Sequence, residues 1–276
     1  MINFNGTLQD NSALYIETNR GFLFGDAVFE TVKIVNSKIV FLEEHYLRLM
    51  ASMRICRMEI PMLLTMEYFE EQIVSLLQAL KFVNARVRFT VFRDSEGYYT
   101  PNSNDVKFVI MANELNNTFY SFSNEPYEVE LFKDFHLSKH LLSTIKTNNK
   151  MIHTLAGIFA KENDYQNCLL INEDKNIVEA IQANIFMKMG DVISTPPISE
   201  GCQNGILRKQ IIKLISKNTN IRFEEKPISP FDLQKADELF LTNVIIGIQP
   251  ITKYRKKMYV NDFATQLLEE LNCLLN

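Results

Sequence analysis

The sequence predicts an α+β protein of two domains. The chain has 276 residues, more than one domain usually holds, and this length suits two domains of about 120–150 residues. Stretches with the alternation of strands and stretches with the three- and four-residue spacing of amphipathic helices are mixed along the chain. The strands come as hairpins rather than in regular strand–helix–strand units, which favours two α+β domains over a doubly wound sheet.

The first half begins with a short strand, INF, and an Asn5-Gly6 turn signal. The segments 27–35 and 38–42 then predict a β-hairpin, because apolar and polar residues partly alternate on both sides of Asn36-Ser37. Apolar residues at helical spacing predict helices over about 42–57 and 65–82, and two strands follow at 85–93 and 106–112. We expect residues 1–113 to form a smaller N-terminal domain with both helices and strands.

A polar stretch, NELNNTFYSFSNEP, is rich in Asn and Ser and ends at a proline, so we expect an interdomain linker at 114–126. Residues 127–276 are then the larger C-terminal domain. Its predicted strands lie near 127–132, 167–172, 184–188, 221–226 and 238–242, and its predicted helices lie near 149–164, 205–217 and from 261 onward.

Composition and charge exclude several functional classes. The net charge is −4, with both signs interspersed, so nothing indicates a nucleic acid or an anionic membrane as partner. No apolar run reaches about 18 residues, and the N-terminus lacks the pattern of a signal peptide. The four cysteines are scattered and predict reduced thiols in a cytoplasmic protein, and the four histidines form no metal-binding motif.

No dinucleotide-binding, Walker or nucleophile-elbow motif occurs, but five separate features follow one another along the chain. A Gly25-Asp26 turn precedes the hairpin, Arg48 lies in the next helix, Lys146 lies in a polar loop, Glu179 follows 33 residues later, and Gly205 opens a helix. A lysine amine, a carboxylate and an anion site are what pyridoxal phosphate requires, for its aldehyde, its ring nitrogen and its phosphate.

Over nearly its full length the chain resembles the fold-type-IV pyridoxal-phosphate enzymes, which include branched-chain and D-amino-acid aminotransferases and 4-amino-4-deoxychorismate lyases. The resemblance implies their two-domain α+β fold, with residues 127–276 as the cofactor-binding domain and the cofactor site between the domains. The stretches that carry it, in the order of the family, are GFLFGDAVFETVK (21–33), HYLRL (45–49), RFTVFRDSEGYY (88–99), IKTNNKM (145–151), VEAIQANIF (178–186), NGILRKQII (204–212) and DELFLTNVIIGIQPI (237–251).

By this resemblance, Lys146 is the catalytic lysine that binds the cofactor, with Lys139 and Lys150 as nearby competitors. Glu179 faces the ring nitrogen, and Arg48 clamps the phosphate. The remaining phosphate contacts come from Gly205, from the N–H groups of Ile206 and Leu207 at a helix start, and from Thr242. The chain departs from the family at Ala183, where serine is usual, and at Leu207, where threonine is common. Each departure removes one hydroxyl contact.

Two residues are candidates for substrate binding. Arg93 matches a position that some members use for the substrate carboxylate, and Phe29 replaces a tyrosine that is common in the D-amino-acid and branched-chain aminotransferases. Phe29, the short chain and the LTNVIIGIQPI stretch favour 4-amino-4-deoxychorismate lyase, which forms 4-aminobenzoate and pyruvate in the folate pathway. A class IV aminotransferase is the alternative, and a catalytically inactive binding protein on the same fold is a third. The resemblance also implies a homodimer and a small, amino-acid-like substrate.

Overall fold

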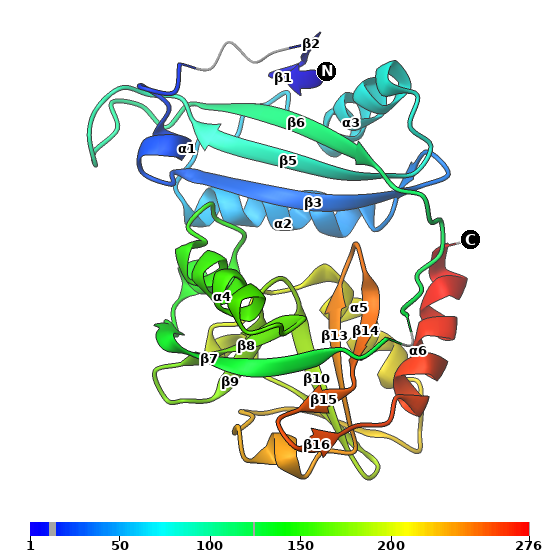
Figure 1. The fold of residues 1–276 in the computed structure, drawn as a ribbon. Helices are drawn as coiled ribbons and strands as arrows, with labels where there is room; N and C mark the ends of the chain where they lie inside the picture. Colours follow the sequence, from blue (N-terminus) through cyan, green and yellow to red (C-terminus); the bar gives the residue numbers. More distant parts are fainter. Residues whose placement is uncertain (11–14, 124, 276) are drawn as a thin grey trace. The chain divides into compact units, whose positions relative to one another are not determined.

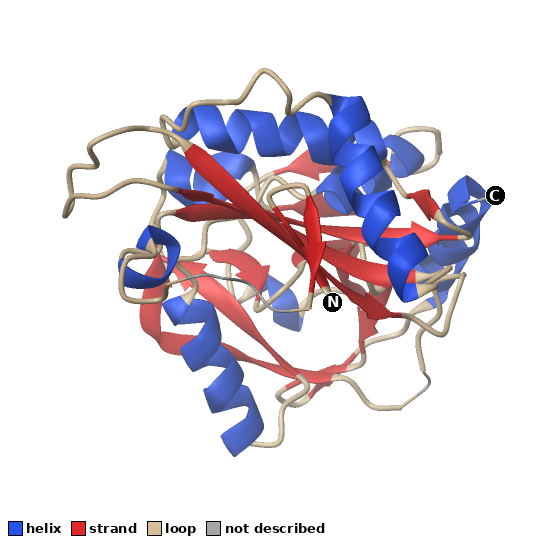
Figure 2. Ribbon diagram, turned by 90° about the horizontal axis from the view of Figure 1, so that it is seen from above, coloured by secondary structure: helices blue, strands red, loops and turns tan. Residues whose placement is uncertain are grey.

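The computed structural model describes residues 1–10, 15–123 and 125–275 (Figure 1). Residues 11–14, residue 124 of the expected linker and residue 276 lie outside the described residues. Within the described part, helices and strands are mixed and the strands form three sheets (Figure 2), so the predicted α+β class is confirmed. The chain divides into two compact units: 1–118 with 145–149, and 119–144 with 150–276.

The first unit is built on an antiparallel sheet in the order β2-β1-β6-β5-β3-β4. Its strands are β1 (Ile2–Phe4), β2 (Thr7–Gln9), β3 (Ala27–Val35), β4 (Lys38–Ile39), β5 (Ala85–Arg93) and β6 (Val106–Glu114). Its helices are α1 (Arg20–Leu23), α2 (Leu42–Ile55) and α3 (Met66–Leu80). The predicted hairpin and the two predicted helices therefore form, although β4 ends sooner than the 38–42 segment, because Phe41 has φ 57° and starts α2.

One face of this sheet forms the core of the first unit together with α2 and α3. The core residues in β3 and β5 stand at alternate positions, as a pleated strand requires. They are Val28, Val32 and Ile34 in β3 and Ala85, Val87, Phe89 and Val91 in β5. The residues between them, Phe29 in β3 and Arg88 in β5 among them, therefore point to the opposite face.

The segment Ile145–Asn149 packs with the first unit, although we expected it in the C-terminal domain. It lies along the free edge of β3, with an antiparallel bridge between Val28 and Thr147. Phe29 N donates to Lys146 O at 2.8 Å, Asn148 N donates to Ala27 O at 3.0 Å, and Ile145 joins the core. The other boundary, between Thr118 and Phe119, falls inside the expected linker at 114–126.

The second unit contains two five-stranded sheets, within the residues described. The first, in the order β16-β15-β7-β8-β9, comprises β7 (Glu128–Leu137), β8 (Asn167–Asn172), β9 (Ile177–Ala180), β15 (Lys253–Tyr254) and β16 (Lys257–Met258). The second, in the order β12-β11-β10-β13-β14, comprises β10 (Asn184–Met189), β11 (Val192–Thr195), β12 (Arg222–Glu225), β13 (Glu238–Asn243) and β14 (Gly247–Ile251).

Both of these sheets contribute to one apolar core, in which Leu169 of β8 packs with Ile185 of β10 and Leu239 of β13. Helix α4 (Met151–Glu162) packs on the remaining face of β7 and β8, where its Ala156 and Ala160 meet Leu170. Helices α5 (Ile206–Ile215) and α6 (Asp262–Asn272) pack against β13. None of the helices in the described residues has the length and apolar content that crossing a bilayer requires.

Candidate functional site

The predicted site residues fall into two sets, one in each unit. Lys146, Phe29, Arg48 and Arg93 belong to the first unit, and Glu179 belongs to the second together with the predicted phosphate contacts. Those phosphate contacts are Gly205, Ile206, Leu207 and Thr242.

Lys146 lies on the face of the first sheet that also carries Phe29. Because Thr147 pairs with Val28, Thr147 and Ile145 point toward the core, so Lys146 and Asn148 point to the other face. The Nζ of Lys146 lies 5.2 Å from the centroid of the Phe29 ring. Edge pairing of backbone groups therefore fixes on which side of the sheet the predicted catalytic amine stands.

Arg88 occupies the same face and was not singled out in the sequence analysis. Its Cζ lies 3.6 Å from the Phe29 ring centroid, which is a close cation–π contact. Its Nε donates to Thr90 Oγ1 at 3.1 Å, and its Nη2 donates to Asn148 Oδ1 at 2.9 Å. Burial lowers the pKa of Arg88, and the charge of Arg86 adds to this effect. Among the described residues, no carboxylate pairs with Arg88.

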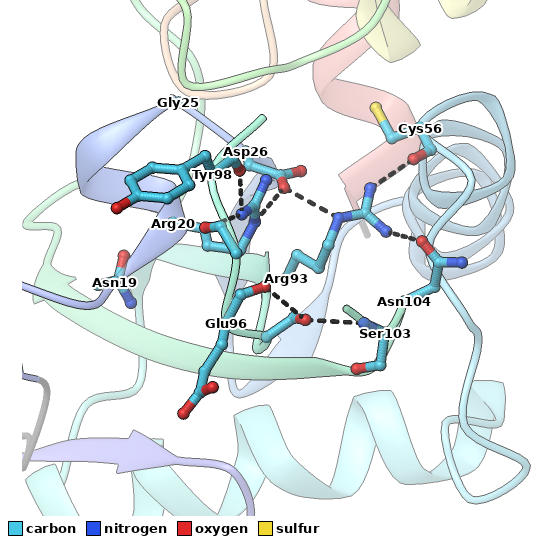
Figure 3. A network of polar contacts seen from close by, with 12 residues as sticks. Asn19, Arg20, Gly25, Asp26, Cys56, Arg93, Glu96, Tyr98, Ser103 and Asn104 are labelled. Atoms are coloured by element: carbon cyan, nitrogen blue, oxygen red, sulfur yellow. Dashed lines mark hydrogen bonds and ion pairs between the residues drawn. The ribbon is translucent and has the colours of Figure 1, made fainter. Parts of the chain in front are cut away.

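Arg93 is held in a network of its own, which Figure 3 shows. Its Nε donates to Asp26 at 2.9 Å, where it shares the carboxylate with Arg20, and it also contacts Asn104 and the backbone carbonyl of Cys56. Only 7% of its side chain is exposed. Arg93 and Arg88 are five residues apart, so strand alternation directs them to opposite faces of β5. These contacts favour a structural role for Arg93 over the substrate role expected from the sequence.

Arg48 forms a bidentate ion pair with Glu30, through Nε to Oε1 at 2.7 Å and Nη2 to Oε2 at 2.6 Å. His45 Nδ1 lies 2.6 Å from the same Oε2. Burial alone would raise the pKa of Glu30, but the charge of Arg48 and the hydrogen bonds from Arg48 and His45 lower it to about 2. Burial lowers the pKa of His45 despite the attraction of Glu30. Glu30 therefore fixes the orientation of the Arg48 guanidinium.

In the second unit, the start of α5 provides the features of an anion site. The first N–H groups of a helix have no carbonyl partner within it, and no described side chain caps this end at Gly205. A Cβ at position 205 would overlap Asn184 Oδ1, so only glycine allows the backbone to lie this close to Asn184. Asn184 pairs with Thr242 across β10 and β13. Thr242 Oγ1 is buried, and it has no hydrogen-bond partner among the described residues.

These observations fit a phosphate group. A dianion would accept from the N–H groups of Ile206 and Leu207 and from the unsatisfied Thr242 hydroxyl, which is costly to leave without a partner. Glu179, predicted to face the ring nitrogen, is 4% exposed and accepts a hydrogen bond from Gln203 N at 2.8 Å. It also contacts His153, a residue that sequence reasoning did not select because no local motif joins two residues 26 positions apart.

The competing lysines have different surroundings. Lys139 pairs with Asp174 at 2.5 Å and with Glu200 at 3.2 Å, and hydrogen bonds to these carboxylates raise its pKa. A protonated amine is a poor nucleophile, which counts against Lys139. Burial lowers the pKa of Lys150, although the charge of Glu179 opposes the shift. Lys150 is therefore the stronger competitor of Lys146.

Comparison with known proteins decides the family. The model of the family "Amino-transferase class IV" matches residues 27–254. The chain belongs to this family. It is therefore an enzyme, and its cofactor is pyridoxal phosphate. The resemblance seen in the sequence is confirmed.

Two relatives are similar over most of their length. A D-alanine aminotransferase of Bacillus licheniformis is 25% identical over 255 residues, which cover 90% of this chain and 86% of the relative. A Methanocaldococcus jannaschii protein named for branched-chain-amino-acid aminotransferase activity is 25% identical over 282 residues, covering 98% and 93%.

Solved structures share the fold. The branched-chain amino acid aminotransferase of Escherichia coli has a TM-score of 0.89 at 20% identity, with 100% of this chain and 94% of that chain covered. A Legionella pneumophila protein named for 4-amino-4-deoxychorismate lyase has a TM-score of 0.86 at 20% identity, covering 96% and 97%. The branched-chain aminotransferase of Thermobaculum terrenum, solved with its pyridoxal phosphate, has a TM-score of 0.84 at 18% identity, covering 99% and 93%.

The buried ion pair of Glu30 and Arg48 should make the free energy of unfolding depend on pH. The pKa of Glu30 is lowered in the folded state, so its contribution is complete above the unfolded value near 4.5 and is lost as pH falls toward about 2. The lowered pKa corresponds to a contribution of roughly 3 kcal/mol to the free energy of unfolding at neutral pH. In urea titrations, Glu30→Gln should lower the free energy of unfolding at neutral pH, and the difference from the wild type should shrink between pH 4.5 and 2. A difference that is constant over this range would contradict the prediction.

Proposed function

We propose that this enzyme transfers the amino group of an amino acid through pyridoxal phosphate, with Lys146 as the catalytic base and Arg88 as the substrate-carboxylate contact. The observation that carries the proposal is the shared position of Lys146, Phe29 and Arg88 on one face of the first sheet. The aminotransferase relatives, which align over 90% and 98% of this chain, support amino transfer.

Bound cofactor supplies an electron sink that acidifies the Cα–H of the amino acid. The residues of this chain would move the proton and bind the substrate and the cofactor. Lys146 would take the Cα proton and return it, which is general acid–base work for an amine. Arg88 can bind the α-carboxylate in a charge-assisted hydrogen bond, and the Phe29 ring limits the rotation of its guanidinium. Gly205, Ile206, Leu207, Thr242 and Arg48 would hold the phosphate, and Glu179 would hold the ring nitrogen.

The lyase remains a second candidate because Phe29 replaces the tyrosine common in the two aminotransferase groups. The first step is the same, but loss of pyruvate follows in place of amino transfer. Purified enzyme should be assayed for keto-acid-dependent amino transfer and, separately, for pyruvate and 4-aminobenzoate release from 4-amino-4-deoxychorismate. Amino transfer without pyruvate release supports the proposal, and the reverse result would replace it with the lyase. The homodimer and the cytoplasmic location stay predictions.

Lys146→Ala should abolish the visible absorbance band of the bound cofactor, because the covalent link forms on this amine. Borohydride treatment of the wild type should fix the cofactor to the peptide that contains Lys146. Lys139→Ala and Lys150→Ala are matched controls from the same stretch of chain, and both should keep the band. Loss of the band in Lys150→Ala, with its retention in Lys146→Ala, would show that the wrong lysine has been chosen.

Arg88→Met should reduce kcat/KM for an amino acid by about 10- to 100-fold, the value of one charge-assisted hydrogen bond. The same variant should barely affect an amine donor that has the same side chain and no carboxylate. Arg86→Met is the control, since Arg86 lies two residues away on the same face of β5. Equal losses for the amino acid and the amine would overturn carboxylate recognition by Arg88.

A further inference from the structure

His153 forms a close contact with Glu179 inside the second unit. Its Nε2 lies 3.0 Å from Glu179 Oε1, and the side chains of the two residues are 12% and 5% exposed. His153 stands in the first turn of α4, and Glu179 is the third residue of β9. The two residues meet because Glu179 pairs with Leu170 of β8, whose side chain packs against α4. The contact therefore follows from the packing of α4 on its sheet.

Both carboxylate oxygens of Glu179 accept from a donor. With its proton on Nε2, the His153 ring donates to Oε1, and Gln203 N donates to Oε2 at 2.8 Å. Gln203 lies two residues before Gly205, where α5 begins. Glu179 thus connects the first turn of α4 with the segment that leads into the predicted phosphate site. Two donors from different segments leave its carboxylate little rotational freedom.

Within the described part of the chain, three charged or titratable groups lie around Glu179. From α4 and the residue before it come His153 and Lys150, whose positive charge attracts Glu179. From the segment before α5 comes Cys202, whose pKa is raised to about 12 by burial and by the charge of Glu179. A buried carboxylate is costly unless it is hydrogen-bonded, and His153 supplies its side-chain contact.

We propose that His153 is a positioning residue that holds Glu179 as an oriented carboxylate for the ring nitrogen of pyridoxal phosphate. The inference rests on the proposed role of Glu179. An ionised, fixed carboxylate keeps the ring nitrogen protonated, and that charge is what draws electrons from the substrate. Each carboxylate oxygen can accept more than one hydrogen bond, so Glu179 can accept from His153, Gln203 and the ring nitrogen at the same time. His153 acts on the cofactor only through Glu179.

His153→Leu should weaken the binding of pyridoxal phosphate by about 10-fold, because a Glu179 carboxylate that can rotate loses most of its charge-assisted hydrogen bond to the ring nitrogen. It should also shift the absorbance maximum of the bound cofactor in the same direction as Glu179→Gln. His153→Gln should restore most of the affinity and the wild-type spectrum, because its amide N–H can donate to the same oxygen. The readouts are the dissociation constant of pyridoxal phosphate, by titration of the apoenzyme, and the absorbance spectrum.

A double-mutant cycle separates positioning from a general structural effect. If His153 acts through Glu179, His153→Leu should add little to the loss already caused by Glu179→Gln. Additive losses would overturn the proposal. His136→Leu is the matched control, since it makes the same substitution at an exposed histidine of β7 and should leave affinity and spectrum unchanged. Should His153→Leu fail to fold, the same comparison is made with His153→Asn, whose shorter side chain should lose the contact.

The outcomes also distinguish this inference from the proposed function. A wild-type protein that takes up no pyridoxal phosphate would overturn both. A wild type that binds the cofactor at Lys146, with affinity and spectrum unchanged in His153→Leu, would overturn only the role of His153. A changed spectrum in His153→Leu that His153→Gln restores, and that disappears in the Glu179→Gln background, supports it.

Discussion

The pairing of Ile145–Asn149 with the free edge of β3 is the constraint on which the first half of the site depends. Two backbone hydrogen bonds, from Phe29 N to Lys146 O and from Asn148 N to Ala27 O, fix the register of this segment. A shift by one residue would turn Lys146 toward the apolar core and Ile145 away from it, which the burial of Ile145 opposes. The position of the amine therefore follows from strand pairing and does not depend on a mobile loop.

Each unit also surrounds a buried carboxylate with hydrogen-bond donors. Glu30 is held by Arg48 and His45, and Glu179 is held by His153 and Gln203 N. A buried charge is expensive unless it is paired and hydrogen-bonded, so such carboxylates orient their partners firmly. In the proposed enzyme, Glu30 orients a phosphate contact and Glu179 orients itself toward the ring. The two units thus apply the same electrostatic principle, each to its own buried carboxylate.

Much of the fold could be predicted from the sequence, because the long helices and strands carry clear periodicity. Helices α2 and α3 and strands β5 and β8 lie close to the predicted ranges. Strand β9, which bears Glu179, was missed as an element, since its four residues are too short for a periodic signal. The placement of Ile145–Asn149 in the first unit was also missed, because it depends on pairing with residues more than a hundred positions away.

Local sequence motifs do not decide which of Arg93 and Arg88 shares a face with Phe29. Both lie in the RFTVFR stretch, and only the register of β5 against β3 shows that Arg88 shares a face with Phe29. His153 is similar, since α4 and β9 bring it to Glu179 without any local spacing rule.

The proposed function depends above all on Lys146 as the residue that carries the cofactor. A crystal structure of the protein grown with pyridoxal phosphate tests this directly. We predict continuous electron density between Lys146 Nζ and the cofactor, with the phosphate at the N-terminus of α5. Density that joins the cofactor to Lys150, or a phosphate bound away from Gly205 and Thr242, would contradict the account.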